Sequence, residues 1–380
     1  MKILLVSMNS IHFRRWSEQL RDSGHEVYWF DILDQGYAPS MSWMTQITGW
    51  KKGFLKKRGR TFIKTRLPKL FNALVHKYDT TVEDAFAKTI REIQPDLVHS
   101  FALYTSCLPI IDVMNENQNI NWLYSSWGSD LFNRSNKPNY NIEVSSVLKR
   151  VDYLITDCKR DQGIAVRMGF KGNHLGVFPG GGGFKLEQFL PFRNPIKDRK
   201  LLLVKGYENE LAKASIVLKA LDLINFSEEI QIILFGCENN FVLEHKTHCK
   251  NISFLPSISH DNIMELMGKS LIYIGNSVSD GMPNTLLEAI SMGAFPIQSN
   301  PGGATAEIIS HEINGLLIED PLDTEDIAAL IQQAVIDTQM IQKAFKYNQI
   351  LAHEQLDYKV IKKEVLKTYA SLDDLKNYHR

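Results

Sequence analysis

The sequence has few cysteines and no excess of either charge, and both absences exclude classes of protein. Its cysteines are far apart and form no CxxC pair; the four are Cys107, Cys158, Cys237 and Cys249. This pattern predicts neither a disulfide framework nor a zinc site, and it is typical of a reducing compartment. Lysine plus arginine number 43, as do aspartate plus glutamate, so the charge gives no indication of nucleic-acid binding.

Long hydrophobic runs are also missing. No apolar run approaches the roughly 20 residues that a membrane-spanning helix needs. The opening residues, MKILLVSM, are too short for the hydrophobic region of a signal peptide and precede no cleavage pattern. We therefore expect a cytoplasmic protein that is soluble or lies peripherally on the inner face of the membrane.

What is present is an alternation of short apolar runs with amphipathic segments. The 380 residues are 44% hydrophobic, and a chain of this length typically forms two domains. Nearly unbroken apolar runs predict buried strands; in the first half they span 2–8, 26–32, 96–102, 121–127 and 152–157. Helical spacing at 13–24 and 81–94 completes a pattern that predicts a parallel sheet with helices on both faces.

The same alternation starts again in the second half. Further strands are predicted at 199–206, 230–236, 270–277 and 294–300. The glycine- and proline-rich stretch 178–200 separates the halves and suits a flexible connection. We expect an N-terminal Rossmann-like domain at 1–183 and a second at 196–349. The spacing at 348–372 predicts a final helix. We expect the C-terminal part of the chain, 350–380, to pack back on the first domain as a helix.

Charge is concentrated at one place, residues 51–77. This insert contains ten lysines and arginines, no acid and several interleaved aromatic and aliphatic residues. Each basic residue near an anionic bilayer contributes about 1 kcal/mol of attraction. The insert is therefore predicted to contact an anionic membrane surface, and the alternative is a solvated insert whose apolar residues pack on the domain.

The stretch 276–308 places three acids around two glycine turns. Asp280 and the following glycine predict a turn, and Glu307 follows a Gly-Gly pair at which a backbone can approach a ligand closely. Between them, PNTLLE at 283–288 predicts a helix start, with Thr285 as cap and Glu288 closing a capping box. Free amides and the positive dipole end of such a helix also favour an anion site.

This run resembles the donor-binding signature of the retaining glycosyltransferases called glycosyl transferases group one, which have the GT-B fold. That signature has two acids separated by seven residues, a glycine after the first acid, a helix at the second acid, and a later Gly-Gly followed by Glu. Asp280 and Glu288 have this spacing. The first acid is usually Glu, and some members carry DGMPN here, as this sequence does. The resemblance covers nearly the whole chain, most strongly 199–320.

The resemblance implies a role for each residue of the run. Asp280 would bind hydroxyls of the donor sugar, and Glu288 would bind those of the nucleotide ribose. A carboxylate suits both tasks because it accepts two hydroxyl hydrogen bonds at a fixed geometry. The backbone would line the sugar and phosphates at Gly281, Met282, Pro283, Asn284 and Thr285.

The family also places basic residues against the pyrophosphate, and Lys205 and Lys213 fall at those positions. Their charge would stabilise the leaving nucleoside diphosphate. Because no DxD-like pair ends a strand, we expect neither a metal ion nor any other cofactor.

The N-terminal domain departs from the family in two places. Instead of a glycine-rich loop after the first strand it has SMNSIHFRRW at 7–16, in which His12, Arg14 and Arg15 are candidates for contacts with phosphates or acceptor. Where the family has a sugar-binding histidine before a turn, this chain has Trp127, so Asp130 in the turn becomes the candidate for that contact.

One further histidine, His99, also ends a predicted strand at the cleft. A lone histidine at such a place is more often a packing residue than a ligand.

We interpret the chain as a retaining hexosyltransferase that transfers a hexose from a nucleoside-diphosphate sugar to a glycan or lipid-linked acceptor, in cell-surface polysaccharide or lipopolysaccharide synthesis. Catalysis is assigned to Asp280, Lys205 and Asp130, and the leaving phosphate would help to deprotonate the acceptor. The alternatives are a nucleotide-sugar epimerase of the same fold and a catalytically inactive binding protein on the membrane face. The base, sugar, acceptor and oligomeric state are left open.

Overall fold

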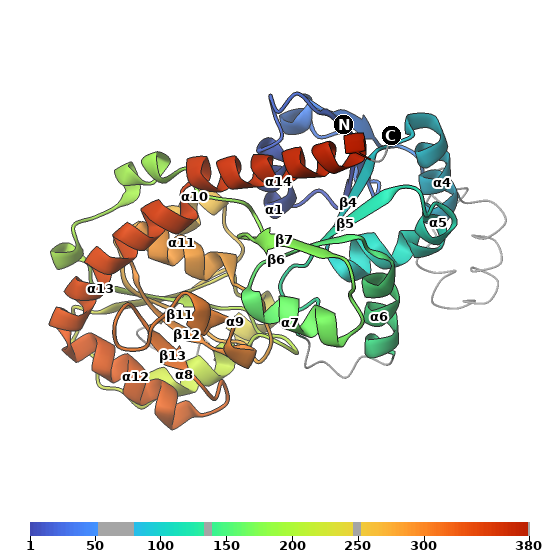
Figure 1. The fold of residues 1–380 in the computed structure, drawn as a ribbon. Coiled ribbons are helices and arrows are strands. Elements are labelled where there is room, and N and C mark those ends of the chain that lie inside the picture. The colour runs from blue at the N-terminus through green and yellow to red at the C-terminus, as the bar shows by residue number, and fades with distance from the viewer. Residues whose placement is uncertain (52–79, 133–138, 246–251, 379–380) are drawn as a thin grey trace.

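The computed structural model describes residues 1–51, 80–132, 139–245 and 252–378, which form two α/β domains (Figure 1). From residue 52 onward, the basic insert predicted to meet a membrane lies outside the described residues. Of the four cysteines, Cys249 also lies outside them.

Among the described residues, the N-terminal domain has seven parallel strands in the order β3-β2-β1-β4-β5-β6-β7. They are β1 (Lys2–Ser7), β2 (Glu26–Asp31), β3 (Thr45–Ile47), β4 (Leu97–Phe101), β5 (Asn121–Ser125), β6 (Tyr153–Thr156) and β7 (Asn173–Val177). The helices around this sheet are α1 (Ile11–Glu18), α4 (Val82–Ile93), α5 (Ile111–Glu116), α6 (Tyr140–Arg150) and α7 (Lys159–Arg167).

The C-terminal domain repeats this plan in its described part, with the strand order β10-β9-β8-β11-β12-β13. Its strands are β8 (Leu201–Lys205), β9 (Gln231–Phe235), β10 (Ile252–Leu255), β11 (Ser270–Gly275), β12 (Phe295–Ser299) and β13 (Leu316–Ile318). The helices are α8 (Ala214–Asp222), α9 (Asn239–His245), α10 (His260–Lys269), α11 (Asn284–Met292), α12 (Thr324–Ile336), α13 (Thr338–Leu351) and α14 (Tyr358–Tyr378).

The strand order reverses beside the first strand of each domain. In the N-terminal sheet β1 pairs with both β2 and β4, and in the C-terminal sheet β8 pairs with both β9 and β11. At such a switch point the loops diverge and leave a crevice outside the carboxyl ends of the strands. The fold therefore places a crevice in each domain at the end of its central strand.

The predicted helix at 348–372 is wrong as a single element. Helix α13 ends at Leu351, and a π-helical turn (Ala352–Leu356) and the extended residue Asp357 separate it from α14. The break is stabilised by backbone pairing with the interdomain connection: Tyr358 N–H donates to the Phe184 carbonyl (2.8 Å) and Phe184 N–H donates to the Leu356 carbonyl (2.7 Å).

Beyond the break, α14 crosses to the N-terminal domain and ends near the N-terminus (Figure 1). Its residues Ile361, Val365 and Tyr369 are buried in one cluster with Ile3 and Trp16 of the N-terminal domain. Removing these apolar side chains from water stabilises the crossing by about 25 cal/mol per Å².

The connection at 178–200 was expected to be flexible, and the structure instead shows it packed against the C-terminal domain. Phe184, Leu186 and Phe189 are buried in the cluster that also contains Leu287. At Gly183 a Cβ would lie 2.8 Å from the Asp357 carbonyl oxygen, so only glycine allows the two segments to approach this closely.

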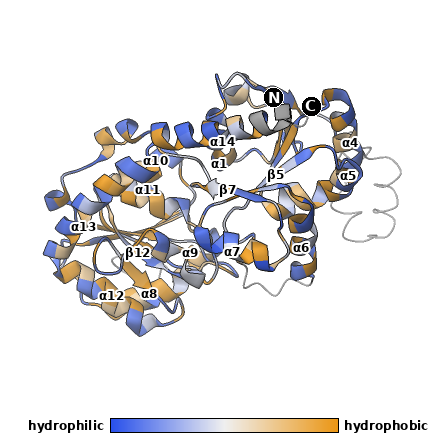
Figure 2. Cartoon of the chain, in the orientation of Figure 1, coloured by the Kyte–Doolittle hydropathy of each residue, from blue (hydrophilic) through white to orange (hydrophobic). Residues whose placement is uncertain are grey.

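Colouring by hydropathy shows apolar residues on the strands and on the helix faces that meet them (Figure 2). Within the described ranges, none of the helices combines the length and the apolar character that crossing a membrane requires.

Candidate active site

Residues that follow strands of both sheets line one cavity of about 520 Å³ between the domains. Met8, Ala102 and Asp157 come from the loops after β1, β4 and β6, and Lys205 and Phe235 are the last residues of β8 and β9. The cavity thus lies at the carboxyl ends of both sheets, which is where open α/β sheets bind their ligands.

The first turn of α11 contributes the polar wall of this cavity. Met282 and Pro283, just before the helix, and Asn284 and Thr285, its first residues, line the cavity, whereas Gly281, which was expected to line it with them, does not. Pro283 stands at the cap position and no side chain caps the helix, which leaves its first amides available to an anion.

The capping box expected between Thr285 and Glu288 is wrong. Thr285 lies inside the helix, and its hydroxyl accepts a hydrogen bond from the Tyr273 hydroxyl (3.0 Å). The Glu288 carboxylate points into the cavity instead, which frees it for a ligand contact.

Glu288 is buried and holds two partners from different parts of the fold. Its Oε1 accepts a hydrogen bond from Arg15 Nη1 of α1 at 2.9 Å and lies 2.7 Å from Nε2 of His260, the first residue of α10. Burial alone would raise the pKa of Glu288, but the hydrogen bonds and charges of His260 and Arg15 outweigh it and lower that pKa. Glu288 is therefore an ionised carboxylate at neutral pH.

Asp280 and Lys205 lie on the same cavity from adjacent strands. Asp280 Oδ1 accepts a hydrogen bond from its neighbour's backbone, Gly281 N–H (2.9 Å), and its carbonyl accepts one from Arg160 Nη2 (2.9 Å). Burial raises the pKa of Asp280, and the positive charges of Lys205 and Arg160 oppose this shift. Together they present a carboxyl group and an ammonium group to a ligand placed against α11.

Lys213, expected beside Lys205, does not line the cavity. It precedes α8, and its Nζ donates a hydrogen bond to the Asn209 carbonyl at 3.0 Å. Its predicted contact with the pyrophosphate would require this side chain to turn away from Asn209.

Asp157 is a cavity residue that the sequence reasoning missed. It is 5% exposed, its Oδ2 accepts a hydrogen bond from Gly128 N–H (3.0 Å), and its Oδ1 has no hydrogen-bond partner. A Cβ on Gly281 would lie 2.4 Å from its Oδ2, so this glycine is needed for the two domains to meet. The signal was present, because an acid directly after a buried strand of a parallel sheet lies at the ligand-binding edge.

Among the N-terminal candidates, His12 and Trp127 line the cavity and Arg14 does not. The rings of His12 and Trp127 pack edge to face, with their centres 6.2 Å apart. Burial lowers the pKa of His12, and its Nδ1 is buried without a hydrogen-bond partner. The Arg14 side chain is exposed, and the next residue, Arg15, provides the cation that reaches Glu288.

His99 is a packing residue. It is fully buried away from the cavity, with Nδ1 2.6 Å from the Tyr369 hydroxyl and Nε2 2.8 Å from Ser125 Oγ. Burial lowers its pKa well below the usual value, so the ring is neutral. The expectation that His99 faces the cleft is corrected.

Asp130 is likewise turned away from the cavity. Its Oδ2 accepts hydrogen bonds from Leu103 N–H (3.0 Å), Trp127 N–H (3.0 Å) and the Tyr124 hydroxyl (2.9 Å). Because one oxygen accepts three buried hydrogen bonds, Asp130 fixes the conformation of the turn that contains Trp127. Asp130 therefore positions this turn, and the expected contact of Asp130 with the sugar is corrected.

We expect Asp130→Ala to lower the free energy of unfolding by about 3 kcal/mol or more, because three donors lose their acceptor. Burial raises the pKa of Asp130 to about 6 from 3.8, so the folded state favours the protonated form, and the stability that this preference adds is lost as pH rises from 3.8 through about 6. Asp130→Asn should therefore remove this pH dependence. Urea unfolding at pH 5 and pH 7.5 checks both variants, and an Ala variant that is stable but inactive would restore the catalytic role.

Glu307, the third acid of the stretch 276–308, also has a structural task. Its carboxylate accepts hydrogen bonds from the backbone amides of Lys159 (2.6 Å) and Arg160 (2.8 Å), the first residues of α7. The cap residue of α7, Cys158, provides no such bond. An acid of the C-terminal domain thus caps a helix of the N-terminal domain.

Within the described part of the chain, one group of side chains has the spacing to hold a metal ion, namely Asp157, Cys158 and Asp161. Burial raises the pKa of both carboxyl groups and of the thiol. Asp161 also forms an ion pair with Arg160 at 2.7 Å. The absence of a metal requirement stays a prediction.

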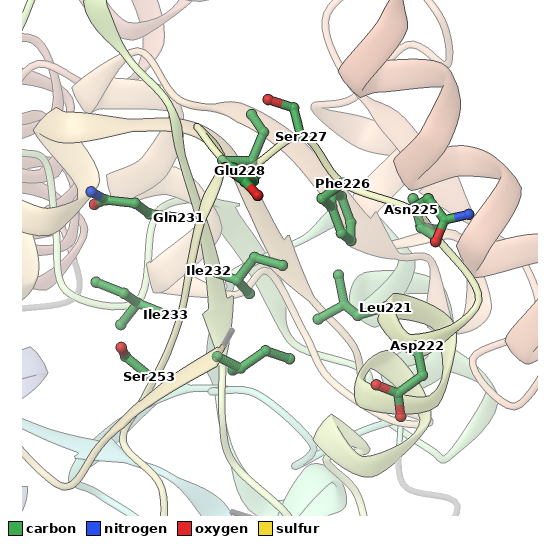
Figure 3. Close-up of a pocket in the computed structure, with 13 residues that line it drawn as sticks. Leu221, Asp222, Asn225, Phe226, Ser227, Glu228, Gln231, Ile232, Ile233 and Ser253 are labelled. Carbon is green, nitrogen blue, oxygen red and sulfur yellow. The ribbon is translucent and has the colours of Figure 1, made fainter. Parts of the chain in front are cut away.

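A larger cavity of about 850 Å³ lies at the opposite end of the C-terminal sheet. Figure 3 shows Leu221, Phe226 and Ile232 there, with polar Asn225 and Gln231 around them. Since its strand residues begin β9 and β10, it lies at the amino ends of the strands and not where α/β sheets bind ligands.

Comparison with known proteins agrees with this geometry. Residues 187–350 match the model of a family described as glycosyl transferases group 1. A search of curated proteins finds no match to the sequence. Among solved structures, sucrose-phosphate synthase from Thermosynechococcus elongatus is 18% identical, with 99% of this chain and 100% of that chain covered and a TM-score of 0.75.

Two more solved structures show the same architecture. HepE from Anabaena, solved in complex with UDP-glucose, is 14% identical, with 98% of this chain and 100% of that chain covered and a TM-score of 0.71. A UDP-forming α,α-trehalose-phosphate synthase from Burkholderia xenovorans is 13% identical, with 98% and 99% covered and a TM-score of 0.66. The predicted GT-B fold is confirmed.

Proposed function

We propose that this chain, whose residues 187–350 match the glycosyl transferases group 1 model, is a glycosyltransferase that transfers a hexose from a nucleoside-diphosphate sugar to a glycan or lipid-linked acceptor with retention of configuration. The observation that carries this proposal is the convergence of Asp280, Glu288 and Lys205 around the uncapped start of α11.

Each group suits one part of a sugar nucleotide. The ionised Glu288 accepts hydrogen bonds from the ribose hydroxyls, and Asp280 accepts them from the sugar hydroxyls. The amides at the start of α11 and the Lys205 ammonium face the diphosphate. The complex of HepE with UDP-glucose makes UDP-glucose the first donor to test.

Transfer breaks the bond between the anomeric carbon and the diphosphate oxygen and forms one to the acceptor oxygen on the same face. The departing diphosphate accepts the acceptor's proton, so no protein base is needed, and the acceptor attacks the face that the diphosphate leaves, so no protein nucleophile takes part. Negative charge develops on the leaving oxygen, where Lys205 and the α11 dipole stabilise it. We propose that these two positive groups act without a metal ion.

The test is to incubate the protein with a panel of nucleotide sugars and acceptors, with and without excess chelator. We expect release of free nucleoside diphosphate that chelator does not reduce, and an NMR spectrum of the product that shows the donor's anomeric configuration. Loss of release in chelator, restored by Mg²⁺ or Mn²⁺, would direct attention to Asp157 and Asp161. An epimerase would instead change the sugar without releasing it, and an inactive binding protein would do neither.

We further propose that the acceptor is met at an anionic membrane surface, in polysaccharide or lipopolysaccharide synthesis. This is supported by the ten cations of 51–77, which belong to the acceptor-side domain. Binding to anionic liposomes should be measurable at low salt and fall steeply as salt rises, because the Debye length shrinks to about 8 Å at physiological salt. A protein that ignores such liposomes at low salt would point to a soluble acceptor.

A further inference from the structure

Arg15 connects the two domains at the candidate nucleotide site. It stands on α1 of the N-terminal domain, and its Nη1 donates to Glu288 Oε1 of α11 at 2.9 Å. The side chains are 24% and 5% exposed, so little water screens the ion pair. In the structure, the group proposed to bind ribose is therefore held by a cation of the opposite domain.

Two donors converge on Glu288 Oε1. With Nε2 protonated, His260 donates to this oxygen over 2.7 Å, and Arg15 donates to the same oxygen through Nη1 over 2.9 Å. Arg15 Nη2 also lies 3.3 Å from His260 Nδ1, which has a lone pair in that tautomer. Because one carboxylate oxygen accepts both hydrogen bonds, His260 still holds Glu288 when a ligand hydroxyl takes the place of Arg15.

The end of α1 that faces the cavity offers little to a phosphate by itself. Ser10 caps this helix, with its hydroxyl accepting a hydrogen bond from Phe13 N–H at 3.1 Å. The cap occupies one of the first amides of α1, so a side chain of this helix would add to its contact with a diphosphate. Arg15 has the long stem and the forked guanidinium that suit a phosphate group.

We propose that Arg15 is a donor-responsive binding residue, which holds Glu288 in the empty cleft and moves to the diphosphate when ribose hydroxyls replace it there. The inference rests on the proposed function, because it assumes that Glu288 binds ribose. Arg15 thereby opposes the nucleoside part of the ligand and favours its phosphate part. Donor binding is linked to the contact between the domains through this one side chain.

Calorimetry can test this proposal, because loss of Arg15 should affect the binding of a nucleoside and of its diphosphate in opposite directions. Dissociation constants are measured for uridine and UDP, guanosine and GDP, and adenosine and ADP with the wild-type protein, Arg15→Gln and Arg14→Gln. For the base that binds, Arg15→Gln should bind the nucleoside as tightly as the wild type or more tightly, and the nucleoside diphosphate more weakly. The preference for the diphosphate should fall about tenfold or more, as expected for a lost charged hydrogen bond.

Arg14→Gln is the matched control, since it removes the same charge from the adjacent, exposed residue of α1. It should keep the wild-type preference for the diphosphate. This preference is the ratio of the two dissociation constants, nucleoside over nucleoside diphosphate, for one variant, so it does not depend on the fraction of protein that is folded. Equal weakening of nucleoside and diphosphate in Arg15→Gln, or no change in either, would overturn the inference. A wild-type protein that binds no nucleoside diphosphate would overturn the proposed function itself.

Discussion

Replacement of Lys205 by alanine is expected to lower the turnover number by about 100-fold or more, the usual effect of removing a group that stabilises developing negative charge. Lys205 ends β8 and lines the cavity, with its Nζ 5.1 Å from the centre of the Tyr207 ring. No ion pair among the described residues includes it, so its charge is available to a ligand. The turnover number of Lys205→Ala should be the same with and without chelator.

Lys200 offers the matched control at the other end of the same strand. It immediately precedes β8, is exposed, and pairs with Glu229 at 2.6 Å on the surface. Lys200→Ala should transfer sugar like the wild-type protein, because exposed ion pairs contribute about 1 kcal/mol or less. Steady-state assays of both variants check this, and equal turnover in the two would remove Lys205 from the mechanism.

Replacement of Asp280 by alanine is expected to lower the rate of transfer by about 100-fold while leaving the affinity for free nucleoside diphosphate within a few-fold of the wild type. The reason is the proposed division of the cavity, in which Asp280 binds the sugar and Glu288 binds the ribose. An interaction with the reacting sugar is lost only when the sugar is present. Calorimetry with the nucleoside diphosphate and single-turnover kinetics with the sugar nucleotide measure the two effects separately.

Two further variants sharpen this test. Asp280→Glu restores the family's usual acid and should retain part of the activity, because the carboxylate remains and only its reach changes. Asp326→Ala removes an exposed acid of α12 and should have no effect. If Asp280→Ala weakens nucleotide binding as much as transfer, Asp280 contacts the nucleotide and the division of the cavity is wrong.

The inner strands of both sheets were predictable because a buried parallel strand needs an almost continuous apolar run. Runs such as 2–8 and 270–277 correspond to β1 and β11, shortened by one or two residues at their ends. The edge strands β3, β7, β10 and β13 were missed, because β3 and β13 have only three residues and because polar residues interrupt β7 and β10. Each pairs along the edge of a sheet that other strands form.

That Asp280 and Glu288 line one cavity was predictable for a local reason. Asp280 and Glu288 lie on one strand–loop–helix unit, so their spacing in sequence sets their spacing in the fold. The capping box was wrong although its pattern was good, because Arg15, 273 residues away, outweighs a local backbone contact as partner for Glu288. The attraction between two opposite charges in a buried place exceeds the stabilisation that a helix-capping hydrogen bond usually provides.

By itself, the sequence determined the α/β class with two parallel sheets, and it placed Asp280 and Glu288 on one strand–loop–helix unit that lines the cavity. Only the tertiary structure decided that Arg15 and not Arg14 contacts Glu288, and that Asp157 and not Asp130 lines the cavity. Consecutive helical residues point about 100° apart, so Arg14 and Arg15 cannot share one target. Which of them faces the cleft depends on how the second domain packs against α1, and no local pattern contains that information.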